Sequence, residues 1–174
     1  MILVDSREQK CNHVTAAFDK LGIPYDRSKL YVGDYTLVSD QSVCIDRKQN
    51  LQEVYSNVIQ QHDRFRREVV RAKTAGIKLI ILVEDPAIEE LDQVANWMNE
   101  RVTRWHFINR MHKLGKMLNV RISPKPPVPS DRLMAAMRSM ALKYGIEWEF
   151  TTHKLCGETI VRILTGEAVQ DGEA

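Results

Sequence analysis

The sequence predicts an α/β fold in which helices flank a central mixed sheet and a helical insertion interrupts the order of the elements. Three patterns lead to this prediction. A nearly continuous apolar run over residues 77–83 is typical of a strand that is buried on both faces. Apolar residues over 51–75 recur at alternating steps of four and three, which predicts a long amphipathic helix. Two β-rich runs, 33–38 and 43–48, are separated by four polar residues and predict a hairpin.

The first half of the chain is expected to follow the order β-α-β-β-β-α-β. The opening apolar run ends at Asp5 and is typical of a buried strand. Gly22 and Gly76 follow the two helical patterns directly, where glycine commonly ends a helix. The expected strands and extended segments are 2–5, 23–32, 33–38, 43–48 and 77–83, and the expected helices are 12–21 and 51–75.

The second half is expected to hold a helical insertion over about 87–122, with helices near 88–100 and 103–119. A proline-rich linker over 123–130 contains four of the six prolines. We expect a helix over 131–144 with Ser130 as its N-cap, a strand over 146–150 and a last helix over 155–165. Residues 1–166 would then form a single domain, followed by an acidic, frayed tail at 167–174.

The composition is that of an ordinary globular chain, with 174 residues of which 44% are hydrophobic and 28% charged. The three cysteines are widely spaced and form no C-x-x-C pair, which argues against a disulfide framework and against a structural zinc site. The sequence has no secretory signal pattern and no apolar run that could cross a bilayer. We therefore expect a cytoplasmic protein, nucleoid-associated if bacterial or viral and nuclear if eukaryotic, with no membrane partner and no organic cofactor.

Charge is distributed unevenly around the insertion. Residues 84–100 contain six acids and no lysine or arginine, whereas residues 101–130 contain seven lysines or arginines and no acid. On the 103–119 helix an apolar stripe is expected at Phe107, Met111, Leu114 and Leu118, with basic residues flanking or opposite it at Arg104, Arg110, Lys113 and Lys116. These four cations either contact DNA phosphates, the interpretation we favour, or pair with the acidic helix before them.

The predicted hairpin carries a concentration of charge with catalytic potential. Side chains alternate along a strand, so Asp46 and Lys48 share one face and Arg47 points to the other. Asp34 on the neighbouring strand can meet Asp46, and Asp5 can add a third carboxylate. Carboxylates that converge repel one another unless a cation joins them, and their oxygens suit Mg²⁺ or Mn²⁺. A lysine beside them can activate water or stabilise charge on a phosphate. The alternative is a solvated hairpin with alternating charges.

Five ordered blocks of this sequence resemble the XPF-type (XPF/Hef-like) structure-specific endonucleases, whose nuclease domain belongs to the PD-(D/E)XK superfamily. The blocks are 4–8 (VDSRE), 32–35 (VGDY), 45–48 (IDRK), 64–68 (RFRRE) and 82–84 (LVE). The resemblance is strong over 1–84 and weaker over 131–166. It implies a restriction-endonuclease-like fold and a metal-dependent endonuclease, acting on branched or flap-containing DNA in recombination or repair. It also permits a homodimer.

Carried over residue by residue, the resemblance implies that Asp34 and Asp46 are ligands of Mg²⁺ or Mn²⁺, together with the backbone carbonyl of Arg47. Lys48 would be the catalytic lysine, and Arg47 would lie beside the site and contact DNA. The remaining active-site residues implied by the resemblance are Asp5, Arg7, Arg64 and Glu68.

Two departures from the family pattern leave alternatives open. Asp46 replaces a glutamate, and Gln52 stands where the family has an acid. Glu53 is adjacent, but on a helix it is expected to point about 100° away from Gln52. The chain can therefore be a catalytically inactive relative that binds DNA or a partner protein. A PD-(D/E)XK nuclease that cuts linear duplex ends is a third hypothesis.

Overall fold

The computed structural model describes residues 1–116 and 119–166, and it has a six-stranded sheet in the order β2-β1-β3-β4-β5-β6. Strand β3 is antiparallel to both of its neighbours, and the other adjacent pairs are parallel. The predicted α/β fold with a mixed sheet is confirmed, and β3 and β4 form the predicted hairpin. The expected tail at 167–174 lies outside the described residues. The strands are β1 (Ile2–Asp5), β2 (Tyr25–Ser28), β3 (Tyr35–Leu37), β4 (Val43–Lys48), β5 (Lys78–Glu84) and β6 (Glu147–Thr151).

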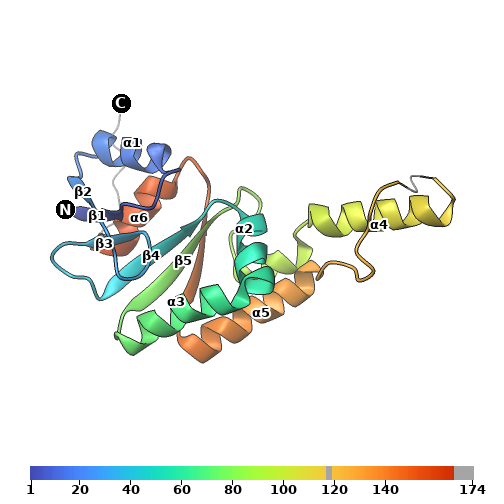
Figure 1. The fold of residues 1–174 in the computed structure, drawn as a ribbon. Coiled ribbons are helices and arrows are strands. Elements are labelled where there is room, and N and C mark those ends of the chain that lie inside the picture. The colour runs from blue at the N-terminus through green and yellow to red at the C-terminus, as the bar shows by residue number, and fades with distance from the viewer. Residues whose placement is uncertain (117–118, 167–174) are drawn as a thin grey trace.

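Helices cover both faces of the sheet (Figure 1). On one face, α2 (Leu51–Tyr55), α3 (His62–Thr74) and α5 (Ser130–Tyr144) pack against Leu79, Ile81 and Val83 of β5. On the other face, α1 (Asn12–Lys20) and α6 (Cys156–Thr165) pack against Ile80 and Leu82. Strand β5 is therefore buried on both faces, as its continuous apolar run predicts.

The topology brings several strand ends to one edge of the sheet. Because β3 is antiparallel to β1 and β4, the C-terminal ends of β1, β4 and β5 lie at the same edge as the start of β3. Asp5 ends β1, Lys48 ends β4, Glu84 ends β5, and Asp34 directly precedes β3. Polar residues from distant parts of the sequence therefore meet at this edge.

The single helix expected over 51–75 is wrong, because a π-helical turn at Ser56–Gln60 separates α2 from α3. The Gln61 N–H donates to Ser56 O, five residues back, at 2.8 Å, and the Asn57 side chain donates to Glu53 O at 2.8 Å. Such side-chain bonds compete with the regular helical ladder. The steps of four and three place Tyr55, His62 and Phe65 on one helical stripe; Tyr55 and Phe65 are buried, whereas His62 is exposed.

The helical insertion also differs from its predicted form. The helix expected over 88–100 is wrong, because only a 3₁₀ helix, η2 (Leu91–Asn96), forms there and packs against α5. The next helix, α4 (Glu100–Lys113), is shorter than the predicted 103–119 and extends away from the sheet as an arm (Figure 1). Its capping residue is Asn99, whose side chain accepts a hydrogen bond from the Arg101 N–H at 3.0 Å. The acidic and basic segments therefore do not form a helical hairpin.

The apolar stripe predicted on α4 is not packed against the protein body. Phe107 and Leu114 are exposed, Met111 is half-buried, and Leu118 lies outside the described residues. Ile108 is the buried residue of the helix. The pattern failed because an arm offers no second layer of secondary structure on which a stripe can pack.

The predicted N-cap of α5 is also corrected. Pro129 occupies the cap position, and Ser130 is the first helical residue. The Ser130 hydroxyl donates to Trp97 O at 2.6 Å, so it joins α5 to the base of the insertion instead of capping its own helix. Over the described ranges 1–116 and 119–166, no helix combines the length and the apolar character needed to cross a bilayer.

Candidate active site

A polar cavity of about 640 Å³ opens at the sheet edge where β1, β3 and β4 meet. Its lining is dominated by charged side chains from β4, the segment before β3, and α3. Seven predicted site residues line it: Arg7, Asp34, Asp46, Arg47, Lys48, Arg64 and Glu68. The sequence therefore predicted seven of the sixteen residues that line this cavity.

Strand β4 supplies the buried ion pair at the base of the cavity. Lys48 Nζ donates to Asp46 Oδ1 at 2.7 Å, and both side chains are buried. Burial disfavours the lysine charge, but the charges of Asp46 and Asp34 outweigh it and raise the pKa of Lys48. Asp46 Oδ2 is buried and has no hydrogen-bond partner in the part of the chain that the structure describes. One oxygen of Asp46 is thus neutralised, and the other is open to a ligand.

Asp34 reaches the same cavity from the turn before β3. Asp34 Oδ2 accepts a hydrogen bond from the Arg47 N–H at 2.9 Å. Burial and the negative charge of Asp46 raise the pKa of Asp34 well above its usual range. Gly33 permits this approach: its φ is +70°, and a Cβ there would lie 2.8 Å from Ile45 O. The absence of a side chain at Gly33 therefore lets the segment that carries Asp34 lie close to β4, which carries Asp46.

Helix α3 contributes a third carboxylate. Glu68 is half-buried and lines the cavity. Burial and the charge of Asp46 raise the pKa of Glu68. Arg64, one turn earlier on the same face, also lines the cavity. The third acid of the cluster is thus on a helix and not on a strand.

The expectation that Asp5 supplies this third carboxylate is wrong. Asp5 Oδ1 accepts from the backbone N–H and Nε of Arg7 at 2.7 and 2.8 Å. Its Oδ2 accepts from Arg7 Nη2 at 2.7 Å and from the Leu30 N–H at 2.9 Å. Both oxygens are therefore occupied, and Asp5 positions the Arg7 guanidinium, which lines the cavity.

Comparison with known protein families identifies the family to which this chain belongs. A family model described as the ERCC4 domain matches residues 4–161. The chain belongs to the ERCC4-domain family. ERCC4 domains are typically nucleases, and these nucleases generally use divalent metals. A search of curated proteins found no match.

Two solved structures resemble this ERCC4 domain in fold. XPF from Aeropyrum pernix is 20% identical with a TM-score of 0.61, and the match covers 97% of this chain and 67% of that chain. The same archaeal protein in complex with DNA is 21% identical with a TM-score of 0.58, covering 98% and 67%. The resemblance to an XPF-type nuclease domain that the sequence blocks indicated is thereby confirmed.

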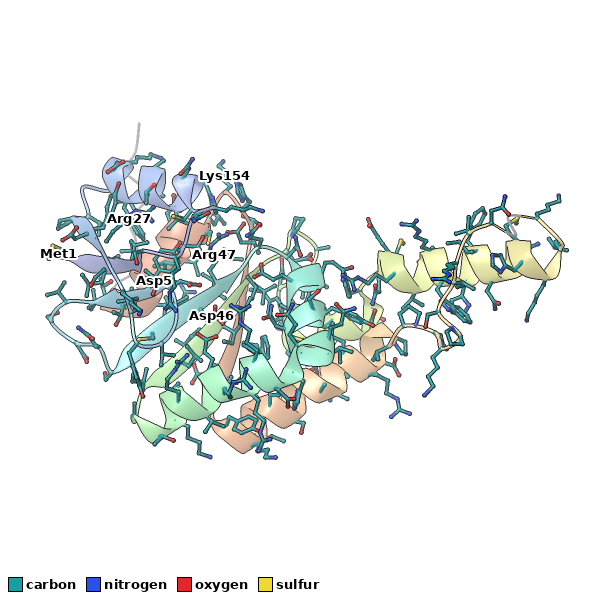
Figure 2. The ribbon with its side chains drawn as sticks, in the orientation of Figure 1. Met1, Asp5, Arg27, Asp46, Arg47 and Lys154 are labelled. Atoms are coloured by element: carbon teal, nitrogen blue, oxygen red, sulfur yellow. The ribbon has the colours of Figure 1, made fainter. Side chains whose placement is uncertain are left out.

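The Arg47 side chain points away from Asp46, as strand alternation predicts, but its surroundings do not permit the DNA contact that the resemblance implies. Its guanidinium is 1% exposed, on the face of β4 opposite Asp46, as Figure 2 shows. It pairs with Glu84 Oε1 at 2.6 Å and with Glu8 Oε1 at 2.7 Å. A DNA contact through this side chain is therefore wrong, because a phosphate cannot reach a guanidinium that is buried and held by two carboxylates. The Arg47 backbone still borders the cavity of the ERCC4 domain.

Glu84 organises a buried polar network that the sequence did not reveal as a unit. Besides Arg47, its carboxylate accepts from His13 Nε2 and His153 Nδ1, both at 2.7 Å. Burial opposes its charge, but the hydrogen bonds from His153, Arg47 and His13 outweigh this effect and lower the pKa of Glu84. The two histidine rings stack at 3.7 Å between centroids. These residues are too far apart in the sequence for spacing to connect them.

Glu53 is a cavity residue that the sequence placed elsewhere. Helix α2 begins at Leu51 after the Asn50 cap, and Glu53 Oε2 accepts from the Gln49 N–H at 2.9 Å. Its carboxylate thus folds back towards the end of β4 and lines the cavity. Gln52 does not line it, and its Nε2 is buried without a hydrogen-bond partner among the described residues. The sequence assigned the site-facing position to Gln52, and the structure gives it to Glu53.

The four predicted cations of the insertion lie outside the cavity. Arg104, Arg110 and Lys113 are exposed on α4, and Lys116 is exposed just beyond it. They belong to the arm that extends from the protein body (Figure 1). The structure thus separates a cluster at the sheet edge from a basic surface on the arm.

The cluster fits a hard divalent cation. Asp34, Asp46 and Glu68 converge in one cavity, and two of them have raised pKa values because of burial and mutual repulsion. The unpaired Asp46 Oδ2 is a buried acceptor of the kind that a ligand must satisfy. Oxygen donors of this type match Mg²⁺ and Mn²⁺.

Proposed function

We propose that this ERCC4 domain is a metal-dependent DNA endonuclease that hydrolyses phosphodiester bonds in branched or flap-containing DNA during recombination or repair. The observation that carries the proposal is the convergence of Asp34, Asp46 and Glu68 beside Lys48, with one buried aspartate oxygen unpaired. A structural role alone does not account for three acids and an open acceptor in a solvent-accessible cavity.

Asp34 and Asp46, with the backbone carbonyl of Arg47, would hold Mg²⁺ or Mn²⁺. When bound, the cation would stabilise the negative charge that develops on the scissile phosphate. Lys48 keeps its proton because its pKa is raised, so its role is electrostatic: the ammonium stabilises the phosphate and does not act as a base. Glu68 has a raised pKa and is suited to accept a proton from the attacking water.

Two arginines complete the proposed site. Arg7 is held at the cavity by both oxygens of Asp5, so its guanidinium is oriented before substrate binds. Arg64 reaches the cavity from α3. Guanidinium groups bind phosphate oxygens in a defined orientation, and these two can position the DNA backbone over the carboxylates.

The branched substrate is supported by the resemblance to XPF-type nucleases and by the arm. Arg104, Arg110, Lys113 and Lys116 would bind phosphates of a DNA segment away from the cleavage point. DNA that branches can occupy the arm and the cavity with different segments. Residues 1–166 would act as one nuclease domain, with an insertion at 87–122 and a linker at 123–130, and could function as a homodimer.

A panel of labelled flap, fork, four-way-junction and linear duplex DNA, each with Mg²⁺, Mn²⁺ or EDTA, tests the proposal. We expect metal-dependent cutting of branched substrates, lost in Lys48→Ala and retained in Lys20→Ala, a control on α1. Preferential cutting of linear duplex ends would support the third hypothesis. Binding without cutting would identify a catalytically inactive relative that binds DNA.

A further inference from the structure

A second groove of about 570 Å³ adjoins the proposed active site along the outer side of α3. Arg67 and Arg71 line both the groove and the active-site cavity, so the two hollows share a wall. The other residues used here, Tyr31, Arg66 and Val70, line the groove alone. We call this feature the Tyr31 groove.

Helical spacing explains the composition of the groove. Phe65, Val69 and Ala72 are the buried residues of α3. The positions between them point outward, so Arg66, Arg67 and Arg71 project from the opposite side of the helix and are exposed. Within the described residues, none of these three arginines forms an ion pair with a carboxylate. Arg66 donates to the Tyr144 hydroxyl, at 3.1 Å, and Asp63 is the one acid among the described residues that line the groove. Three guanidinium groups against one carboxylate on this surface favour an anionic ligand with several charges.

Tyr31 adds an exposed aromatic ring to this basic surface. The side chain is 65% exposed, and the guanidinium of Arg71 lies 5.5 Å from the ring centroid. Its backbone is held firmly, because the neighbouring Leu30 donates its N–H to Asp5 Oδ2 at 2.9 Å and its carbonyl accepts from Arg7 Nη2 at 3.2 Å. Val32 on the other side is 1% exposed. The backbone thus places the ring beside the active site without burying it.

We propose that the Tyr31 groove binds an unpaired DNA strand that leads into the proposed active site. One base would stack on Tyr31, and successive phosphates would contact Arg66, Arg67 and Arg71. Base stacking on an aromatic ring requires an exposed base face, which a continuous duplex does not offer. This inference rests on the proposed function and adds to it a single-stranded element of the substrate.

The continuity of the groove with the cavity favours DNA over an acidic peptide. A strand that contacts Arg67 and Arg71 already lies at the wall of the cavity that holds Asp46 and Lys48. An acidic peptide bound in the groove would have no use for the adjoining phosphodiesterase site. The groove would therefore position the strand from the side of α3, while the arm contacts another segment of the DNA.

Fluorescence anisotropy in EDTA tests the proposal independently of cleavage. The probes are a labelled single-stranded oligonucleotide and a blunt duplex of equal length. We expect Tyr31→Ala to weaken single-strand binding about tenfold and Tyr31→Phe to retain it, since the phenyl ring still stacks. Duplex binding should change less than about twofold in both variants. Arg66→Ala should lower the salt-dependence slope for the single strand by about 0.7.

Two control variants remove side chains of similar exposure or charge away from the groove. Leu142→Ala removes another exposed apolar side chain, 90% exposed on α5, and Lys20→Ala removes a surface charge on the opposite face of the sheet. Neither should alter single-strand binding. An unchanged melting temperature of Tyr31→Ala would show that its fold is intact, as expected for an exposed side chain.

The proposal would be overturned by undetectable single-strand binding, by equal losses in Tyr31→Ala and Tyr31→Phe, or by an equal loss on duplex. Displacement of the strand by polyglutamate with the same affinity in wild type and Tyr31→Ala would also overturn it. Failure of the nuclease proposal would give a different experimental result. In that case the domain cuts no substrate, while Tyr31→Ala still selectively weakens single-strand binding.

Discussion

Two aspartates at the same edge of the sheet show how neighbours decide the role of a residue. Asp5 is enclosed by hydrogen bonds from Arg7 and Leu30, which outweigh the effect of burial and lower its pKa. Asp34 is half-buried beside Asp46, and desolvation together with the charge of Asp46 raises its pKa. The first is a satisfied structural anion that positions an arginine. The second is an anion that lacks compensation, as expected of a metal ligand before its metal binds.

The contrast gives a prediction for Asp34→Asn. The amide removes the repulsion with Asp46 and can still accept the Arg47 N–H. In EDTA at neutral pH the variant should melt roughly 2–4 °C above wild type, the shift expected for about 1 kcal/mol in a domain of this size. It should also lose the thermal stabilisation that Mg²⁺ or Mn²⁺ gives wild type. Differential scanning fluorimetry measures both effects, and a lower melting point in EDTA would contradict the account.

For single residues, the sequence predicted which face of a strand a side chain points to, but it did not predict which residues that side chain contacts. The alternation along β4 correctly separated Asp46 and Lys48 from Arg47. The third acid was assigned to Asp5 because strand ends are visible in a sequence, whereas the partners of Asp5 and the reach of Glu68 are tertiary facts. Glu53 was misplaced for a related reason: helical angle says nothing about a side chain that folds back over a helix N-terminus.

Among the elements, the ends of β4 and β5 are joined to α1 and the segment before α6 through Glu84. Its pKa is lowered, so it contributes stability that is present above its ordinary value of 4.5 and lost as the pH falls through the folded value. Glu84→Gln should cost about 3 kcal/mol at pH 7, because the buried Arg47 loses a charged partner. The difference in the free energy of unfolding between Glu84→Gln and wild type should become smaller as the pH falls below about 4.5, because Glu84 then becomes protonated in wild type.

Urea unfolding at several pH values measures this difference. Glu147→Gln is the matched control on the same sheet, because its pair with Lys78 is half exposed on both sides and should be worth less than about 1 kcal/mol. A Glu84→Gln variant as stable as this control would show that the network contributes little. A pH-independent difference would instead point to packing as the source of the loss.

Close packing of α1 on α6 gives a second prediction for the elements. A Cβ at Gly157 would lie 2.4 Å from the Ala17 Cβ and 3.0 Å from Val14 O. Gly157→Ala should therefore destabilise the fold by about 1–3 kcal/mol through overpacking, although alanine is the better helix former. Thermal melts compare it with Gly22→Ala, where a Cβ meets nothing within 4 Å and the cost is that of a positive φ. A stabilised Gly157→Ala variant would contradict the packing.

In the segment 51–75 and in the insertion, the spacing of apolar residues did not predict the type or the length of the helices that form. A π-helical turn leaves the spacing of apolar residues in place, so 51–75 read as one helix. The segment around η2 was read as a full helix from its apolar residues, although only a short 3₁₀ helix forms there. The buried strand β5 and the hairpin were predictable because their patterns depend on the sheet alone.

Across the whole molecule, the arm and the cavity are separate surfaces that one branched DNA could occupy together. Arg104→Ala combined with Arg110→Ala should weaken binding to a fork and lower the salt-dependence slope by about two. The double variant Lys20→Ala with Lys154→Ala, on the α1 side of the molecule, is the charge-matched control. Anisotropy titrations between 50 and 200 mM salt, a range that separates such slopes, measure both. Equal slopes for the two double variants would exclude the arm from DNA binding.

If Asp34, Asp46 and Lys48 form a working phosphodiesterase site, single-turnover cleavage of a labelled fork should depend on them and on a divalent cation. Wild type, Asp46→Ala and the surface control Arg132→Ala would be compared in Mg²⁺ and in EDTA. The account predicts cleavage by wild type and the control in Mg²⁺ alone, and a loss of at least about 100-fold in Asp46→Ala. Equal rates for Asp46→Ala and wild type, or cleavage that persists in EDTA, would contradict it.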